Sequence, residues 1–317
     1  MDKRKFWIIA RKYATFAILC LIVAAMFFLT DRFFTANNLS NVGRQVSMNA
    51  ILSVGMTMVI ISGGIDLSVG AIVAMSGVVC AEIISKTGQV VLAILAALLI
   101  GILVGFINGI LIAKTQIAPF IITLSSCSIC SGIVQASTMA MPIPLDNEGF
   151  KVLGQGSLAI IPIPFLVMLF IFILAAFLMN RTKFGRYVYA IGGNEKASIV
   201  AGIQVIKIKT MVYVLCGFLA ALAGVIYTSR LSSGTPSLGE GYEMDAITAA
   251  VIGGASLSGG SGGIWGTLIG AIIIGVIKNA LNLLQVNSYY QDIVTGAVVL
   301  AAVLFDRFIQ TRVNEES

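Results

Sequence analysis

The sequence predicts an all-α, polytopic membrane protein of about ten transmembrane helices, some of them broken. Of its 317 residues, 58% are apolar and only 11% are charged, which is more apolar surface than one soluble core can bury. Apolar runs of about 20 residues, the length that spans a bilayer, recur nearly from end to end. Histidine is absent, so the usual metal ligand and general base is missing. We therefore expect one membrane domain over residues 1–317, without a metal site and without nucleic acid as a partner.

Ten apolar segments are the expected spans, and two of them are short. They cover residues 14–30, 46–61, 67–84, 90–113, 117–137, 161–180, 210–229, 246–257, 264–284 and 290–305. The short segment 246–257 could instead be re-entrant. Prolines and glycines in the outer loop 138–160 predict a structured cap or a short hairpin, and the polar segment 37–44 predicts an amphipathic lead-in.

The distribution of positive charge predicts the orientation. Lys and Arg cluster near the chain ends and in the interior loop 181–209, and positive charge favours the cytoplasmic side of a membrane. We therefore expect both termini and this loop in the cytoplasm. Lys278 falls inside a span, where it either extends towards one face of the membrane or indicates a different substrate.

The stretch "SGGIDLSVGA", residues 62–71, places Asp66 between two apolar runs. A carboxylate at the bilayer centre costs on the order of 3 kcal/mol or more, so it needs a partner or water. One interpretation is that Asp66 is the N-cap of the span 67–84, because the glycines let the backbone leave the helix and the freed N–H groups can be capped by Asp66 or Ser68. The other is that Asp66 lines a polar path. We favour the cap because the order Gly-Gly-x-Asp is typical of a helix start, and both hold if the break lies inside the protein.

A second glycine-rich segment is similar to the first: "GGIDLS" at 63–68 reappears as "GGASLS" at 253–258. We expect the span after the first copy to run outward and the span after the second to run inward, which indicates an inverted repeat of the kind found in transporters. Chance similarity between glycine-rich helices is the alternative. The run "GGASLSGGSGG" is not followed by the Lys-Ser/Thr pair of a P-loop, so we expect neither a nucleotide site nor a catalytic site.

The cytoplasmic loop 181–209 predicts two short helices separated by the break Gly192-Gly193-Asn194. The second begins at Glu195, an acid at a helix N-terminus, and ends at Gly202. An ordinary basic loop is the simpler interpretation, but two short helices form a more compact element than a tether requires. We interpret the pair as a docking element.

Four stretches carry a resemblance to a known family, in order and over nearly the whole chain: "SGGIDLSVGA", "FGRYVYAIGGNEKAS", "GYEMDAITAAVIGGASLSGG" and "NSYYQDIVTGAVV". They resemble the membrane subunits of ribose-type sugar ABC importers, which form a larger group with the branched-chain amino-acid permeases. The resemblance implies ATP-driven uptake across the bacterial cytoplasmic (inner) membrane. It also implies a second permease copy or a paralogue, a cytoplasmic ABC ATPase that binds ATP and Mg, and an external sugar-binding protein. This chain itself would bind no cofactor.

Three sets of candidate site residues follow. The resemblance implies an ATPase-coupling set within the docking element: Gly192, Gly193, Asn194, Glu195, Lys196, Ala197 and Gly202. Small polar side chains on the spans suit a transient sugar contact, with helix–helix hydrogen bonding as the alternative for each: Ser47, Asn49, Ser53, Thr57, Asp66, Asn108, Thr123, Ser125, Asn279, Asn282 and Tyr289. Acidic residues on the outer side are candidates for docking of the binding protein: Glu240, Glu243 and Asp245.

Competing functions remain. A secondary transporter driven by an ion gradient would use Asp66 as its coupling-ion group, but acids within the spans are sparse. A membrane enzyme or scaffold is the third alternative, but an enzyme would have few candidate catalytic groups here, since histidine and clustered carboxylates are missing. For an ABC permease, ribose, a related monosaccharide, a nucleoside or another small polar solute would each suit an uncharged path.

Overall fold

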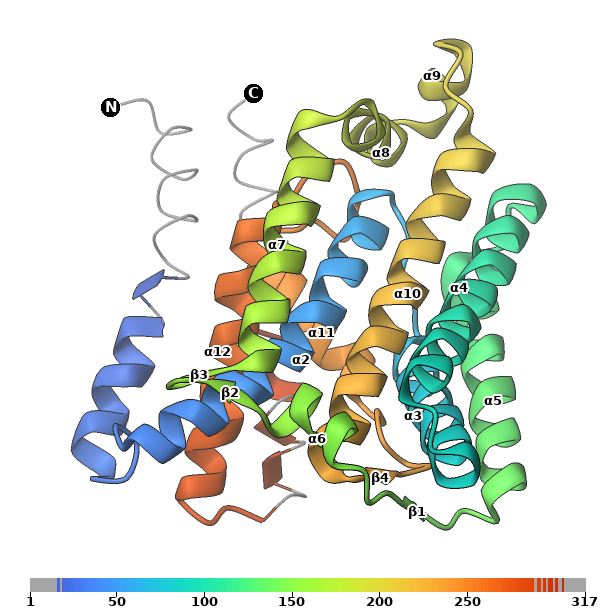
Figure 1. The fold of residues 1–317 in the computed structure, drawn as a ribbon. Helices are drawn as coiled ribbons and strands as arrows, with labels where there is room; N and C mark the ends of the chain where they lie inside the picture. The colour runs from blue at the N-terminus through green and yellow to red at the C-terminus, as the bar shows by residue number, and fades with distance from the viewer. Residues whose placement is uncertain are drawn as a thin grey trace, which may run out of the picture.

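The computed structural model describes residues 16–17, 19–287, 290–291, 293–294, 296–298, 300–301 and 304. Figure 1 shows a bundle of long helices with short elements at both ends. The helices are α2 (Ala36–Ile61), α3 (Val69–Thr87), α4 (Val90–Thr115), α5 (Pro119–Thr138), α6 (Glu148–Gln155), α7 (Ile163–Arg181), α8 (Lys183–Gly193), α9 (Glu195–Val200), α10 (Val205–Leu231), α11 (Tyr242–Ile252) and α12 (Ile264–Leu283). Two antiparallel strand pairs join β1 (Ile143–Pro144) to β4 (Ser233–Gly234) and β2 (Ser157–Leu158) to β3 (Ile161–Pro162).

Within the described residues, seven helices are long and apolar enough to cross a membrane: α2, α3, α4, α5, α7, α10 and α12. They confirm seven of the predicted spans, whereas a total of ten is not confirmed. The described part of the predicted span 14–30 contains a shorter apolar helix, Leu19–Leu29. Most of the predicted span 290–305 lies outside the described residues, as do the ends of both termini, whose cytoplasmic placement stays a prediction.

The predicted short span 246–257 is the 11-residue helix α11. At about 1.5 Å per residue it is roughly 16 Å long, about half of a hydrocarbon core. The helix ends at Ile252 because Gly253 and Gly254 follow, the latter with φ +93°. The predicted segment begins four residues too late and ends five residues too late, and of its two interpretations, a span or a re-entrant segment, the span is wrong. The predicted lead-in 37–44 is also different from expectation, since it forms the first turns of α2 and is continuous with that span.

Helix α2 lies at the centre of the bundle, where α3, α10, α11, α12 and α7 surround the cluster of apolar side chains to which it contributes. Met48, Ile51 and Leu52 of α2 are fully buried. Helices α4 and α10 approach closely at glycines: a Cβ on Gly101 would lie 2.2 Å from the carbonyl oxygen of Gly217. Small residues of this kind allow membrane helices to pack backbone against backbone.

The loop 138–160, which is predicted to lie on the outer side, is structured as expected. It contains α6, whose N-cap Asn147 accepts a hydrogen bond from the Phe150 N–H at 3.0 Å, and it contributes β1 and β2, one strand to each of the two strand pairs. In addition, the Gly154 N–H donates to Ser229 Oγ of α10 at 2.8 Å. This loop therefore forms a cap on one end of the bundle, opposite the end that carries α8 and α9 (Figure 1).

The two glycine-rich segments lie side by side, with the Gly260 N–H donating to the Ile61 carbonyl at 2.9 Å. From this contact α3 and α12 both run towards the end of the bundle where β1 pairs with β4 (Figure 1). The expectation of opposite directions, and with it the inverted repeat, is not confirmed.

Candidate coupling element and polar interior

The predicted pair of short helices is present as α8 and α9, joined at Asn194. The Asn194 Oδ1 accepts a hydrogen bond from the Ala197 N–H at 2.9 Å and so caps α9. Glu195 forms an ion pair with Lys209 of α10 at 2.5 Å. After α9 the chain turns at Gly202, which has φ +80°. These contacts fix α9 at the edge of the molecule (Figure 1).

The coupling set divides into packed and open positions. Gly192 lies against backbone atoms of neighbouring segments, while Gly193 has no atom within 4 Å of the place where a Cβ would stand. Lys196 and Ala197 are exposed on α9. Beside them two apolar side chains are exposed in this single chain, Ile199 at 57% and Val200 at 90%. An apolar tip of this kind is typical of a surface that another protein covers.

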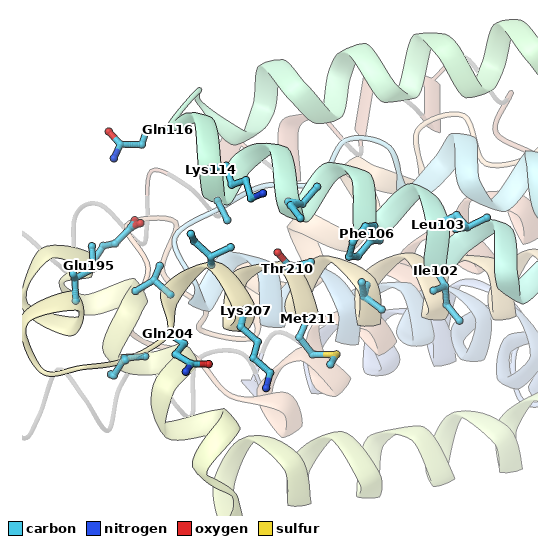
Figure 2. A pocket seen from close by; sticks show the side chains of 17 residues that line it. Ile102, Leu103, Phe106, Lys114, Gln116, Glu195, Gln204, Lys207, Thr210 and Met211 are labelled. Atoms are coloured by element: carbon cyan, nitrogen blue, oxygen red, sulfur yellow. The ribbon is translucent and has the colours of Figure 1, made fainter.

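A cavity of about 1070 Å³ opens next to α9, between α4 and α10 (Figure 2). Glu195 and Ile199 line it at α9, and apolar side chains such as Phe106 and Met211 line it further along the bundle. Lys114 and Lys207 also belong to its lining. The coupling element therefore borders a hollow surface and is not packed against the bundle on every side.

Most predicted path residues on α2 are buried and bound to their own chain. Ser47 and Ser53 donate to carbonyl groups of α2 itself. The Asn49 Oδ1 accepts from the Tyr227 hydroxyl of α10 at 2.8 Å, and Thr57 shares a hydrogen bond of 2.7 Å with Thr267 of α12. Asn49 and Thr57 therefore have the helix–helix role that was the alternative, whereas Ser47 and Ser53 bond within α2. They do not face an open surface of this chain.

Asn279 of α12 is bound in the same way. Its amide exchanges two hydrogen bonds with the amide of Asn38 of α2, at 2.9 and 3.1 Å. By contrast, Ser125 on α5 and Asn282 on α12 are exposed in the single chain. Tyr289 lies outside the described residues. Ser125 donates to the Ile121 carbonyl at 2.8 Å and Asn282 accepts from Gln291 at 2.9 Å, so these two side chains differ from the other described candidates in their exposure and not in being unbound.

Asp66 is fully buried in the break between α2 and α3. Its Oδ1 accepts from the Ser68 N–H at 2.9 Å and from the Ser68 hydroxyl at 2.6 Å. Ser68 is the N-cap residue of α3, so of the two predicted capping residues the favoured one, Asp66, is wrong. Asp66 instead closes the turn that precedes the helix, and its oxygens are not exposed to any open path in this chain.

The turn at Asp66 is held by α4 and α5. Asn108 of α4 donates to Ser68 Oγ at 3.0 Å and accepts from the Ser126 hydroxyl of α5. Thr123 of α5 donates to the Ile65 carbonyl at 3.3 Å. Asn108 and Thr123 therefore act together with Asp66, but as a hydrogen-bonded support for a broken helix.

The three acids predicted for binding-protein docking differ in exposure. Glu240 is exposed and Glu243 is half-buried. Asp245 is buried and forms an ion pair with Lys278. Asp245 is therefore unavailable as a docking residue. The same pair accounts for the unexpected charge at Lys278, which is bound to a partner inside the bundle.

The sequence analysis missed four partners of these residues: Asn38, Ser126, Tyr227 and Thr267. Each is a polar side chain in or beside an apolar segment. A search for polar residues at matching depth on different spans would have found Tyr227 and Thr267, because a polar group in a membrane helix needs a partner at its own level.

The seven apolar helices of bilayer length define a multi-pass membrane protein. The chain belongs to the family described as branched-chain amino acid transport system / permease component, whose profile matches residues 38–303. No solved structure matches the chain.

Curated relatives are similar to the chain over almost its whole length. The ribose import permease protein of Bacillus subtilis is 47% identical over 301 residues, which cover 94% of each chain. That of Haemophilus influenzae is 45% identical over 302 residues, again 94% of each. The D-allose transport system permease protein of Escherichia coli is 39% identical, covering 96% of this chain and 93% of its own.

Proposed function

We propose that the chain is the membrane-spanning subunit of an ATP-driven, binding-protein-dependent importer for ribose or a related monosaccharide. The observation that carries this proposal is the near-full-length similarity to ribose import permeases, at 45–47% identity. The allose permease is also similar, but at 39%. The higher identity to the ribose proteins favours ribose over allose as the substrate.

In this proposal a cytoplasmic ABC ATPase, which binds ATP and Mg, docks on α9. The exposed residues Lys196 and Ala197, with the apolar tip Ile199 and Val200, support this role. The adjoining cavity gives the ATPase a concave surface (Figure 2). This places the α8–α9 end of the bundle in the cytoplasm, in agreement with the positive charge of the loop 181–209.

The path for the sugar would form between two permease subunits, a second copy or a paralogue. Polar side chains on α2 are occupied within the chain, whereas Ser125 and Asn282 remain exposed. The sugar-binding protein would dock on the opposite end of the bundle, near the exposed Glu240. Affinity for the sugar would then reside mainly in the binding protein.

Reconstitution into liposomes tests the proposal. We expect the permease with its cognate ATPase, ATP and the sugar-binding protein to take up radiolabelled ribose, and the permease alone to take up none. Allose and a nucleoside, each supplied with the same components, define the specificity. Uptake by the permease alone, driven by a proton or sodium gradient and abolished by Asp66→Asn, would instead establish a secondary transporter.

A further inference from the structure

Three segments of the chain meet at the α8–α9 end of the bundle. They are the end of α2 at Ile61, the end of α8 at Gly192, and the glycine-rich loop at residues 259–262. The Gly260 N–H donates to the Ile61 carbonyl at 2.9 Å, which joins the two helix breaks directly. Gly192 fits against this hydrogen bond: a Cβ there would lie 1.7 Å from the Ile61 oxygen and 2.6 Å from the Gly260 nitrogen.

A second contact from the same helix reaches the same loop. The Tyr189 hydroxyl donates to the Gly262 carbonyl at 2.9 Å. Tyr189 and Gly192 are three residues apart and therefore lie on one face of α8. Gly193 has no neighbour within 4 Å of its Cβ position. One face of α8 is thus fitted to the junction of the two breaks.

The backbone conformation of the loop 259–262 allows α8 to pack directly against it. Gly259 and Gly260 have φ +81° and +73°, a left-handed conformation that other residues rarely adopt. A Cβ on Gly260 would lie 2.8 Å from Gly193 Cα, and one on Gly259 would lie 2.8 Å from the Gly192 oxygen. The backbones of α8 and the loop are therefore in direct contact, with no side chain between them that could absorb a movement.

We propose that Gly192 and Tyr189 are positioning residues that transmit a displacement of the α8–α9 element to both helix breaks at once. The inference rests on the proposed function, because the displacement comes from the docked ATPase. Closely packed backbones move as one body and do not deform gradually. From the junction, one break leads through the turn at Asp66 into α3, and the other leads into α12. A single contact therefore reaches two of the bilayer-length helices.

Three variants of the reconstituted complex test this role. Gly192→Ala places a methyl group in the junction. Gly263→Ala is the matched control, since Gly263 directly follows the same loop as the N-cap of α12, has an extended φ of −161° and has no atom within 4 Å of its Cβ position. Tyr189→Phe removes one hydrogen bond and retains the ring. If Gly192→Ala does not fold, this second variant still tests whether α8 transmits movement to the junction. For each variant we measure ATPase binding, ATP hydrolysis and the ribose transported per ATP.

We expect Gly192→Ala to bind the ATPase normally but to transport at least about fivefold less ribose per ATP, as for the loss of a typical coupling free energy. Tyr189→Phe should show a smaller decrease in the same ratio, and Gly263→Ala none. An unchanged ratio in both Gly192→Ala and Tyr189→Phe would overturn the inference, and so would a loss of ATPase binding that explains the whole decrease. If the wild-type complex fails to transport ribose, the proposed function fails instead.

Discussion

Lys278 of α12 forms an ion pair with Asp245 in the first turn of α11, and the pair connects the two helices on either side of the second break. The Asp245 side chain is 3% exposed and that of Lys278 22%. Because α11 is too short to span the membrane, its position depends on such contacts with α12 and α2.

Removing only one charge of the Asp245–Lys278 pair should therefore destabilise the fold more than removing both charges. We expect Asp245→Asn to lower the free energy of unfolding by about 3 kcal/mol, because it leaves the Lys278 charge without compensation in an apolar bundle. The combination of Asp245→Asn with Lys278→Met should recover most of that loss. Thermal unfolding of the detergent-purified protein measures both. A double variant that is as unstable as the single one would show that the pair is not the cause.

The hydrogen bond between Tyr227 and Asn49 allows a test of the polar interior. Tyr227→Phe should lower the free energy of unfolding by about 1 kcal/mol, since it leaves the Asn49 oxygen unpaired at a buried site. Tyr187→Phe on α8 removes the same hydroxyl from a side chain that is 37% exposed, and we expect no change. Equal stability of the two variants would mean that Asn49 finds another partner, and would reopen its assignment to the sugar path.

The sequence was sufficient to locate the bilayer-length helices and insufficient to say which of them face lipid. Hydropathy describes how apolar a segment is, and a helix surrounded by protein can be as apolar as one surrounded by lipid. Helix α2 is an example: the sequence predicts that its polar residues line the sugar path, yet the helix lies at the centre of the bundle. Burial of a membrane helix depends on contacts between distant segments, which composition does not contain.

Features that depend on a few neighbouring residues were predicted more accurately than contacts between distant segments. Gly192-Gly193-Asn194 predicted the joint between α8 and α9 because helix ends and caps are decided within a few residues. The partner of Asp245 was not predictable in this way, since Lys278 is 33 residues away. The contact of Gly192 with Ile61 and Gly260 was equally out of reach, because nothing in the local sequence specifies which backbone will lie against a glycine.

The cap formed by the loop 138–160 should lose stability in acid. Lys151 of α6 donates to Asp146 at 2.7 Å and to Glu148 at 2.6 Å. The hydrogen bond from Lys151 and its positive charge lower the pKa of Asp146 below the ordinary value of 3.8. A carboxylate with a lowered pKa in the folded state adds stability above its unfolded pKa, and that contribution is lost as the pH falls through the folded value.

We therefore expect the amides of residues 143–158 to keep their protection from hydrogen exchange between pH 7 and pH 5, and to lose part of it below pH 3.8. The effect should be small, because both carboxylates are exposed. Lys151→Gln should reduce protection at pH 7 and abolish the change on acidification. Loss of protection already between pH 7 and pH 5 would point to a different group.

The cap of α9 provides the most direct test of ATPase docking. Asn194 binds the Ala197 N–H, and α9 has only six residues, too few to be stable as an isolated helix. Asn194→Ala should cost about 1 kcal/mol of helix stability, which corresponds to roughly fivefold weaker binding of the ATPase if α9 must be folded to bind. Asn194→Asp keeps a side chain that caps equally well, and we expect this variant to bind the ATPase like the wild type.

Titration of the purified ATPase against each permease variant in detergent measures these affinities. Equal affinity for Asn194→Ala and Asn194→Asp would show that the ATPase does not depend on the folded α9, and docking would then have to be assigned to another part of the α8–α9 end.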